Sequence, residues 1–265
     1  MPILETESLC RSFGTLTAVD CLTLAVEQGQ IFGLLGPNGA GKTTVIKMLT
    51  TLLPPTSGTA RVDGFDIVRR ARDVRRSIGY VPQMLSADGT LTGYENLLVF
   101  AKLYDMPRRE RKGRVRDALR LMDLTDAADR LVRTYSGGMI RRLEIAQSML
   151  HAPKVLFLDE PTIGLDPVSR QTVWERIMQL QVDFGTTILL TTHYMEEADA
   201  LCTRVAIMHL GKLRAVGTPS ELKESIGGDG ATLEQVFVHY VGAVTESGGT
   251  YRETFRARRT ARRLG

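Results

Sequence analysis

The segment Gly36–Thr43, which spells Gly-Pro-Asn-Gly-Ala-Gly-Lys-Thr, constrains this chain more than any other feature. It follows the apolar run Ile31–Leu35, which is predicted as a buried strand. It opens a predicted helix over Lys42–Leu53, which the prolines at 54 and 55 must end. Glycines let the backbone bend around an anion, and the helix N-terminus adds a favourable dipole. A strand, a glycine-rich turn and a helix in this order predict a loop that binds nucleotide phosphates.

The residue types in this loop predict ATP and Mg²⁺ as its ligands. Lys42 is expected to reach the β- and γ-phosphates, and Thr43 is expected to ligate Mg²⁺. Backbone N–H groups around them are expected to point at the phosphates. The loop residues predicted to contact the nucleotide are Gly36, Asn38, Gly39, Gly41, Lys42, Thr43 and Thr44.

Further apolar segments predict an α/β fold with a mainly parallel sheet. Helical patterns, such as Val168–Gln181 and Tyr194–Leu201, separate several of these segments. Strands that alternate with helices are typical of a parallel sheet covered by helices on both faces. The additional strands of this sheet are predicted at Ile78–Val81, Val155–Leu158, Thr187–Leu190 and Val205–Met208.

Two smaller regions are predicted to differ from this core. Residues 3–10, 22–26 and 59–63 are predicted as strands of an antiparallel β subdomain. Between about 85 and 150 the strand pattern disappears, so a helical subdomain is expected to be inserted there. Its helices are predicted over Tyr94–Tyr104, Arg108–Met122 and Gly137–Leu150, and a last helix over Leu233–Val241 follows the glycine-rich break at 227–230.

The charge divides the chain into a domain over residues 1–242 and a basic tail over residues 243–265. The tail carries six arginines and two glutamates, so its net charge of +4 equals that of the whole chain. The body therefore has no basic excess that would indicate a nucleic-acid-binding surface. We expect a solvated, flexible tail, and the alternative is a segment that docks on anionic lipid or RNA.

The remaining composition limits where the protein works. No stretch reaches the roughly 18 apolar residues of a membrane span, and the first residues do not resemble a signal peptide. The three cysteines, Cys10, Cys21 and Cys202, lack metal-ligand spacing. They are typical of reduced cytosolic thiols rather than of a disulfide framework.

An acidic pair, Asp159 and Glu160, directly follows the strand predicted at Val155–Leu158. In open α/β sheets, ligands bind at this carboxyl edge of the strands. Asp159 is expected to hold Mg²⁺, and Glu160 to polarise the water that attacks the γ-phosphate. The alternative is an acidic helix cap, because Pro161 follows. The phosphate loop elsewhere in the chain favours the first interpretation.

Beyond these motifs, an ordered set of residues matches a known family. Ser136, Gly137 and Gly138 precede a predicted helix, about twenty residues before the acidic pair. Gln83, the segment Gly164–Asp166 and His193 complete the set. With it, residues 3–242 resemble the ATP-binding subunit of an ABC transporter. The resemblance implies an ABC-type ATPase: a P-loop NTPase core with an antiparallel β subdomain and an inserted helical subdomain.

The resemblance also implies a role for each matching residue. Two such subunits would pack head to tail around two ATP molecules, and residues 136–138 of one would complete the site of the other. Gln83 would sense Mg²⁺ and link the core to the helical subdomain. His193 would contact the γ-phosphate, and Asp166 would shape the dimer interface. Phe13 fits the position that stacks on adenine, although a phenylalanine that ends a strand is often simply part of the core.

The signature around Ser136 departs from the usual Leu-Ser-Gly-Gly-Gln. Tyr135 replaces the leucine, and Met139 replaces the glutamine, whose amide hydrogen bonds a thioether cannot make. Ser-Gly-Gly-Met followed by Arg-Arg-Leu at 141–143 resembles the branch linked to daunorubicin-type drug resistance exporters. The segment Thr232–Phe237 fits that branch as well.

These resemblances imply an ATP-hydrolysing motor that works at the cytoplasmic face of the cell membrane and drives a separate membrane permease. They also imply a homodimer and no nucleic-acid partner. Export of a drug or another hydrophobic compound is the implied transport. Two alternatives are a soluble ABC-type ATPase acting on the ribosome or nucleic acid, and a degenerate subunit that does not hydrolyse ATP. The single ATPase domain argues against the first, and intact Lys42, Glu160 and His193 argue against the second.

Overall fold

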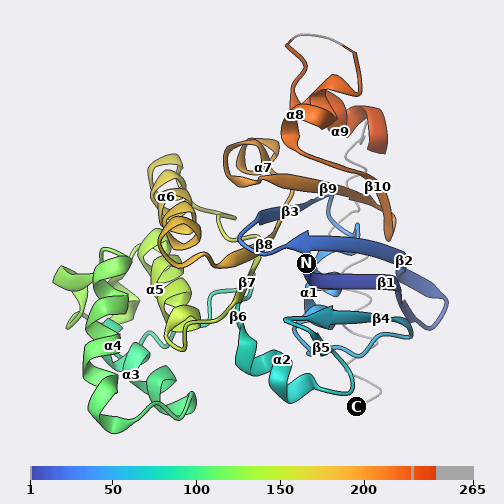
Figure 1. The fold of residues 1–265 in the computed structure, drawn as a ribbon. Coiled ribbons are helices and arrows are strands. Elements are labelled where there is room, and N and C mark those ends of the chain that lie inside the picture. The colour runs from blue at the N-terminus through green and yellow to red at the C-terminus, as the bar shows by residue number, and fades with distance from the viewer. Residues whose placement is uncertain (1, 228–229, 243–265) are drawn as a thin grey trace, which may run out of the picture.

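A six-stranded sheet forms the centre of the computed structural model, which describes residues 2–227 and 230–242 (Figure 1). Its strand order is β10-β9-β3-β8-β7-β6. All neighbours pair in parallel except β9 and β10, which are antiparallel. The strands are β3 (Ile31–Leu35), β6 (Ile78–Val81), β7 (Val155–Asp159), β8 (Thr187–Thr192), β9 (Arg204–His209) and β10 (Lys212–Gly217). The predicted mainly parallel sheet is confirmed.

Both faces of this sheet are buried, which explains its continuous apolar strands. In β3, Phe32 and Leu34 belong to one hydrophobic cluster, while Ile31 and Leu35 belong to the other. Strand β7 alternates between the same two clusters. The sheet therefore separates one core, beneath the antiparallel sheet and α1, from a second core beneath the larger helices.

The second sheet is antiparallel, with the order β2-β1-β4-β5. It places the N-terminal strands beside the central sheet (Figure 1). Its strands are β1 (Pro2–Phe13), β2 (Leu16–Glu27), β4 (Ser57–Val62) and β5 (Phe65–Asp66). The sequence predicted β1, β2 and β4 but missed β5, which is only two residues long. In the central sheet it missed β10.

Between β6 and β7 the chain forms a helical segment that projects away from both sheets, coloured green to yellow in Figure 1. It contains α3 (Gly93–Leu103), α4 (Arg108–Leu121), α5 (Gly137–Met149) and the 3₁₀ turns Thr125–Ala127 and Val132–Thr134. Helix α3 begins with a capping box, in which Thr92 and Glu95 exchange hydrogen bonds with each other's backbone N–H. The three helices lie where the sequence predicted them, to within one residue at each end.

The remaining helices surround the central sheet. They are α1 (Lys42–Leu49), α2 (Ala71–Ser77), α6 (Pro167–Phe184), α7 (Met195–Leu201), α8 (Pro219–Glu224) and α9 (Leu233–Val241). Helix α1 is shorter than the prediction of Lys42–Leu53. Thr51 adopts a left-handed backbone with φ 64°, and the N–H groups of Leu52 and Leu53 both bond to the carbonyl of Lys47. This turn ends the helix four residues early, before the prolines could.

Among the described residues, no helix is long and apolar enough to cross a bilayer. The predicted basic tail at 243–265 and the middle of the glycine-rich break at 228–229 lie outside the described residues.

Candidate nucleotide-binding site

The glycine-rich loop joins β3 to α1, and two of its glycines are required by the backbone. Gly39 and Gly41 have φ values of 81° and 101°, in the left-handed region that other residues rarely adopt. At Gly41 a Cβ atom would also lie 2.4 Å from the carbonyl oxygen of Ala18. The close approach of β2 therefore fixes the loop as a turn of exposed N–H groups at the start of a helix, which is an anion-binding geometry.

Lys42 is the first residue of α1, and its side chain folds back over the loop. Its Nζ donates hydrogen bonds to the carbonyl oxygens of Gly36 (2.7 Å) and Pro37 (3.2 Å). The same Nζ lies 3.3 Å from Oε1 of Glu160. Burial lowers the pKa of the Lys42 ammonium, and the nearby carboxylates of Glu160 and Asp159 oppose that shift. The ammonium of Lys42 therefore lies beside the phosphate loop, and its charge is not fully neutralised there.

Glu160 lies at the centre of the site, directly after β7. Its Oε2 lies 3.2 Å from Nδ1 of His193 and accepts a long 3.5 Å hydrogen bond from Nε2 of Gln83. The side chain is 7% exposed, and the backbone is left-handed with φ 49°. A non-glycine residue in this region is strained, and such strain often marks a functional position. The backbone N–H donates to the carbonyl and hydroxyl oxygens of Thr191, which holds Glu160 in this conformation.

Asp159 and Thr43 form a second pair beside Glu160. The Thr43 hydroxyl donates to Oδ1 of Asp159 over 3.1 Å, and the Thr191 hydroxyl donates to the same oxygen over 2.6 Å. Hydroxyl and carboxylate oxygens are the donors that Mg²⁺ prefers. The residues present therefore fit a magnesium ion between the loop and the end of β7.

A cavity of about 390 Å³ gathers most of these groups. Phe13, whose side chain is 45% exposed, stands at its edge beneath the guanidinium of Arg11, 4.6 Å from the ring centroid. An exposed ring fits a stacking surface better than a core position. The cavity lining is Phe13, Leu16, Ala18, Asn38, Gly39, Ala40, Gly41, Lys42, Thr43, Thr44, Gln83 and Glu160.

The other predicted residues lie apart from this cavity. Ser136 caps α5 by accepting a hydrogen bond from the N–H of Met139 (3.3 Å), and Asp166 caps α6 by accepting one from Ser169 (3.0 Å). Hydrogen bonds with the side chain and with the backbone N–H of Ser169 lower the pKa of Asp166. The two helix starts pack together, because a Cβ on Gly137 would lie 3.1 Å from Leu165. Ser136, Gly137, Gly138 and Asp166 thus form a second constellation, and none of them is among the residues that line the cavity.

Replacing Gly138 with alanine is expected to disturb this second constellation. The new Cβ would lie 2.7 Å from Cβ of Ser169, so α5 and α6 must move apart. We expect a loss of about 1–3 kcal/mol in the free energy of unfolding, which is typical of overpacking. Chemical denaturation measures it. The control is Gly113→Ala in α4, where a Cβ meets nothing within 4 Å and alanine favours the helix. Equal stability of the two variants would contradict the predicted contact.

A buried ion pair connects α5 to the segment that carries Gln83. Arg141 donates to the carbonyl oxygens of Pro82 (2.7 Å) and Gln83 (2.8 Å), and lies 3.1 Å from Oε2 of Glu144. Glu144 in turn accepts hydrogen bonds from the N–H groups of Ser86 and Ala87. Both charged side chains are 2% exposed. The helix that begins at the Ser-Gly-Gly sequence is therefore fastened to the loop at 82–87.

Removing one partner of this pair is expected to be costly. Arg141→Met leaves Glu144 charged and buried, so we expect a loss of about 3 kcal/mol in the free energy of unfolding. The double variant Arg141→Met/Glu144→Met should recover part of it, because no buried charge is left unpaired. Urea denaturation of the single and double variants measures the difference. A double variant less stable than Arg141→Met would contradict this account.

Sequence reasoning missed three residues that shape the site. Thr191 was part of the strand-ending sequence before His193, but its contacts to Asp159 and Glu160 depend on the parallel pairing of β7 and β8. Arg141 entered the sequence analysis only as part of Arg-Arg-Leu at 141–143, and Glu144 only as a charged residue in a predicted helix. Apart from each other, their partners lie more than 50 residues away along the chain, so no local pattern reports these contacts.

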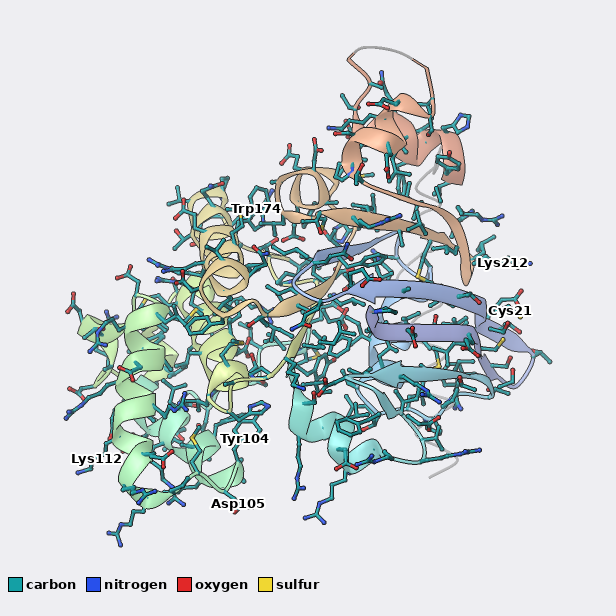
Figure 2. All side chains as sticks on the ribbon, in the orientation of Figure 1. Cys21, Tyr104, Asp105, Lys112, Trp174 and Lys212 are labelled. Carbon is teal, nitrogen blue, oxygen red and sulfur yellow. The ribbon has the colours of Figure 1, made fainter. Side chains whose placement is uncertain are left out.

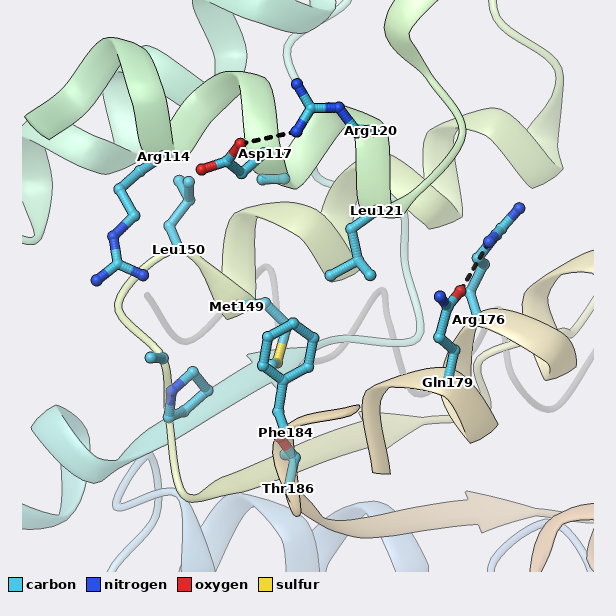
Figure 3. Close-up of a pocket in the computed structure, with 13 residues that line it drawn as sticks. Arg114, Asp117, Arg120, Leu121, Met149, Leu150, Arg176, Gln179, Phe184 and Thr186 are labelled. Carbon is cyan, nitrogen blue, oxygen red and sulfur yellow. Dashed lines mark hydrogen bonds and ion pairs between the residues drawn. The ribbon is translucent and has the colours of Figure 1, made fainter. Parts of the chain in front are cut away.

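A larger cavity, of about 580 Å³, lies away from these motifs (Figure 3). Figure 3 shows Phe184 and Met149 in its floor, with arginines of α4 and α6 around them. Arg120 pairs with Asp117, and Arg176 donates to Gln179. None of the predicted site residues lines it. Volume alone therefore does not locate the chemistry of this protein.

A glycine-rich phosphate loop, a strand-ending acidic pair and an inserted helical segment define a P-loop nucleotide-binding ATPase. The profile of the family described as ABC transporter matches residues 19–163. The chain belongs to this family, as an ATP-binding domain that hydrolyses ATP.

Known proteins resemble the chain over most of its length. It is 49% identical to the daunorubicin resistance ATP-binding protein DrrA2 of Streptomyces coeruleorubidus, over 84% of this chain and 69% of that protein. It is 40% identical to the linearmycin resistance ATP-binding protein LnrL of Bacillus subtilis, over 86% and 73%. A solved ATP-binding subunit of an ABC transporter superposes with a TM-score of 0.79 at 28% identity, covering 90% of this chain and 99% of that one.

Proposed function

We propose that this chain is the motor subunit of an ABC exporter, in which ATP binding and hydrolysis drive a separate membrane permease. The observation that carries the proposal is the convergence of Lys42, Gln83 and His193 on the carboxylate of Glu160, beside the phosphate loop. This arrangement supplies a cation for phosphate, a base for water and two polar groups that respond to the nucleotide.

In this proposal the phosphate loop binds the anion and Glu160 acts on water. The ATP phosphates replace Glu160 as the partner of Lys42, which frees the carboxylate. Glu160 then accepts a proton from the attacking water. His193 reaches the γ-phosphate from the end of β8, and Gln83 reports the state of the site to the loop at 82–87. Phe13 stacks on the adenine ring.

Thr43, Asp159 and Gln83 are the residues proposed to hold Mg²⁺, whose charge would neutralise the transferring phosphoryl group. Thr43 and Asp159 already share a hydrogen bond, so the two oxygens are positioned together. Thr191 donates to the same carboxylate and keeps its orientation.

The second constellation supports a dimer. Ser136 and Asp166 begin two adjacent helices, and Ser136 with the glycines after it offers N–H groups to an anion. Since these residues do not line their own cavity, we propose that they complete the nucleotide site of a second copy, packed head to tail. Closure of that site would exclude water and align the nucleophile. Met139, in place of the usual glutamine, leaves the Ser-Gly-Gly donors intact.

The names of the relatives indicate the kind of transport. Several are resistance proteins for daunorubicin, doxorubicin or linearmycin, and two from other bacteria are Nod factor export ATP-binding proteins. We therefore propose export of a drug or another hydrophobic compound, with the chain bound peripherally at the cytoplasmic face of the membrane. The helical segment and the loop at 82–87, where Met84 and Leu85 are exposed, would receive the permease.

The proposal is tested by isolating the protein with its partners. Tagged Glu160→Gln protein is incubated with ATP in detergent-solubilised membranes of the native host, recovered by its tag, and analysed by mass spectrometry. We expect a membrane protein with several spans to be recovered. The control is Lys42→Met, which should bind ATP far more weakly and should recover less of this membrane protein. Recovery of ribosomal or nucleic-acid-binding proteins instead would overturn the proposal in favour of a soluble ATPase.

A further inference from the structure

Two thiols face each other on the hairpin of β1 and β2, outside the nucleotide cavity. Sγ of Cys10 lies 3.4 Å from Sγ of Cys21. Figure 2 shows Cys21 on this hairpin, near Lys212 at the start of β10. Cys21 is exposed and Cys10 is partly exposed, so dissolved reagents can reach both. A pair of accessible thiols in contact is chemically different from two isolated ones.

A β-bulge creates this contact. Leu9 pairs with Leu22 and Arg11 pairs with Val19, so Cys10 alone opposes both Asp20 and Cys21. Cys21 adopts a left-handed backbone with φ 50° at the bulge. Its N–H donates to Sγ of Cys10 over 3.1 Å. The bulge therefore turns a backbone donor and a second thiol toward one sulfur.

The two thiols have unlike acidities. Partial burial opposes ionisation of Cys10, but hydrogen bonds with Ser57 and with the N–H and side chain of Cys21 outweigh it, so the pKa of Cys10 is lowered. The pKa of Cys21 is raised, first by its hydrogen bond to Cys10 and then by the charge of that sulfur. Cys10 is thus the nucleophile, and Cys21 is the thiol that remains protonated beside it.

We propose that Cys10 and Cys21 form a reversible oxidation site, which low-molecular-weight disulfides convert into a disulfide bond that weakens nucleotide binding. The Cys10 thiolate attacks one sulfur of the oxidant, forms a mixed disulfide and expels one thiolate. Cys21 then attacks Sγ of Cys10, gives up its proton to solvent and expels the second thiolate. Two protein thiols are oxidised, and one oxidant disulfide is reduced to two thiols.

A bound metal explains the same pair less well. Asp20 brings a carboxylate oxygen to within 4.8 Å of both sulfurs, which would give a cation three ligands. Structural zinc sites take four ligands from the protein, and the described residues bring only these three together here. In addition, Lys212 lies 3.2 Å from the carboxylate of Asp20 and competes for it. The hairpin is therefore better suited to thiol chemistry than to a metal.

The expected effect of the disulfide on nucleotide binding rests on the function proposed above. A disulfide requires the sulfurs to move from 3.4 Å to about 2.05 Å, and in this proposal β2 shifts at the bulge as they come together. Two residues before the bulge, the carbonyl oxygen of Ala18 lies so close to Gly41 of the phosphate loop that a Cβ atom on Gly41 would be only 2.4 Å from it. The N–H of Asp20 also bonds to the carbonyl of Gly211. A shift of β2 is therefore transmitted to the loop rather than absorbed.

The oxidation site is tested on the full chain with oxidised glutathione. We expect an intact mass lower by the two hydrogens, restored by dithiothreitol, and a peptide that joins residue 10 to residue 21. Cys21→Ser should stop at a glutathione adduct on Cys10, while Cys10→Ser should react slowly at Cys21. Cys202→Ser is the matched control and should behave as the wild type, because Cys202 is buried and its pKa is raised by that burial. Adducts without the joined peptide, or a zinc ion that protects both thiols as purified, would overturn the site.

The coupling is tested by nucleotide binding to the reduced and oxidised forms, followed by fluorescence of an ATP analogue. Oxidation should weaken binding several-fold in the wild type and in Cys202→Ser, and not in Cys10→Ser. Equal affinity of a fully joined protein would overturn the coupling alone. Absence of binding by the reduced protein would overturn the proposed nucleotide site instead, so the two failures are distinguishable.

Discussion

Replacing Glu160 with glutamine is expected to lower the rate of ATP turnover by about 10²–10⁴-fold while ATP binding persists. The amide keeps the size of the side chain but cannot accept a proton from water, and general-base catalysis contributes a factor of that order. The loss of charge also removes the partner of Lys42, 3.3 Å away, so ATP no longer competes with a carboxylate for that cation. Steady-state phosphate release measures turnover, and fluorescence of a nucleotide analogue measures binding.

The matched control is Glu196→Gln in α7, whose side chain is 83% exposed and pairs loosely with Arg170 at 3.7 Å. It changes the same functional group near His193 without touching the phosphate loop, and we expect unchanged turnover. If Glu160→Gln kept wild-type turnover, Glu160 would not be the hydrolytic base. If it lost binding as well, Glu160 would be required for the fold of the site rather than for chemistry.

The phosphate loop could be predicted from sequence because its constraints are local. Only glycine tolerates the φ values at positions 39 and 41, and the strand before the loop is apolar on both faces. The ends of the elements were harder to predict. Helix α1 ends in a turn at Thr51 that the sequence does not mark, and β10 alternates charged residues at the edge of the sheet. Both depend on the neighbours that the fold supplies.

The site could be predicted residue by residue but not as an arrangement. Order along the chain suggested Gln83, Glu160 and His193, yet their convergence follows from the parallel pairing of β6, β7 and β8, whose carboxyl ends meet at one edge. The left-handed backbone of Glu160 could not be foreseen, because glutamate before proline has no preference for it. The proximity of Cys10 and Cys21 could not be foreseen either, since a β-bulge brings them together and their spacing along the sequence does not indicate it.

Replacing Lys42 with methionine is expected to weaken ATP binding by about 10²–10⁴-fold. Methionine keeps the apolar stem but removes the hydrogen bonds from a charged group, each contributing about 1.5–3 kcal/mol. It also leaves the carboxylate of Glu160 without its cation next to the incoming phosphates. The variant should therefore bind nucleotide less tightly than the loss of the lysine contacts alone implies. Equilibrium titration with a fluorescent ATP analogue measures it.

The chain offers a close control in Lys47→Met, one turn further along α1 and exposed to solvent. It removes the same charge from the same helix, so long-range electrostatics change alike in the two variants. We expect less than a twofold change in affinity. The double variant Lys42→Met/Glu160→Gln should recover part of the lost affinity, because no uncompensated carboxylate remains. A double variant that binds no better than Lys42→Met would contradict the competition between Glu160 and phosphate.

The lowered pKa of Lys42 predicts the direction in which ATP affinity changes with pH. Burial lowers the pKa of its ammonium below the ordinary 10.5, and the carboxylates around it only partly restore the pKa. The protonated form binds phosphate, so affinity is full at low pH and declines as pH rises through the lowered pKa of the free protein. We expect wild-type affinity to begin falling at pH values below the ordinary lysine pKa, and Lys42→Arg to abolish this decline, because a guanidinium stays charged there. A decline that persists in Lys42→Arg would assign the titration to another group.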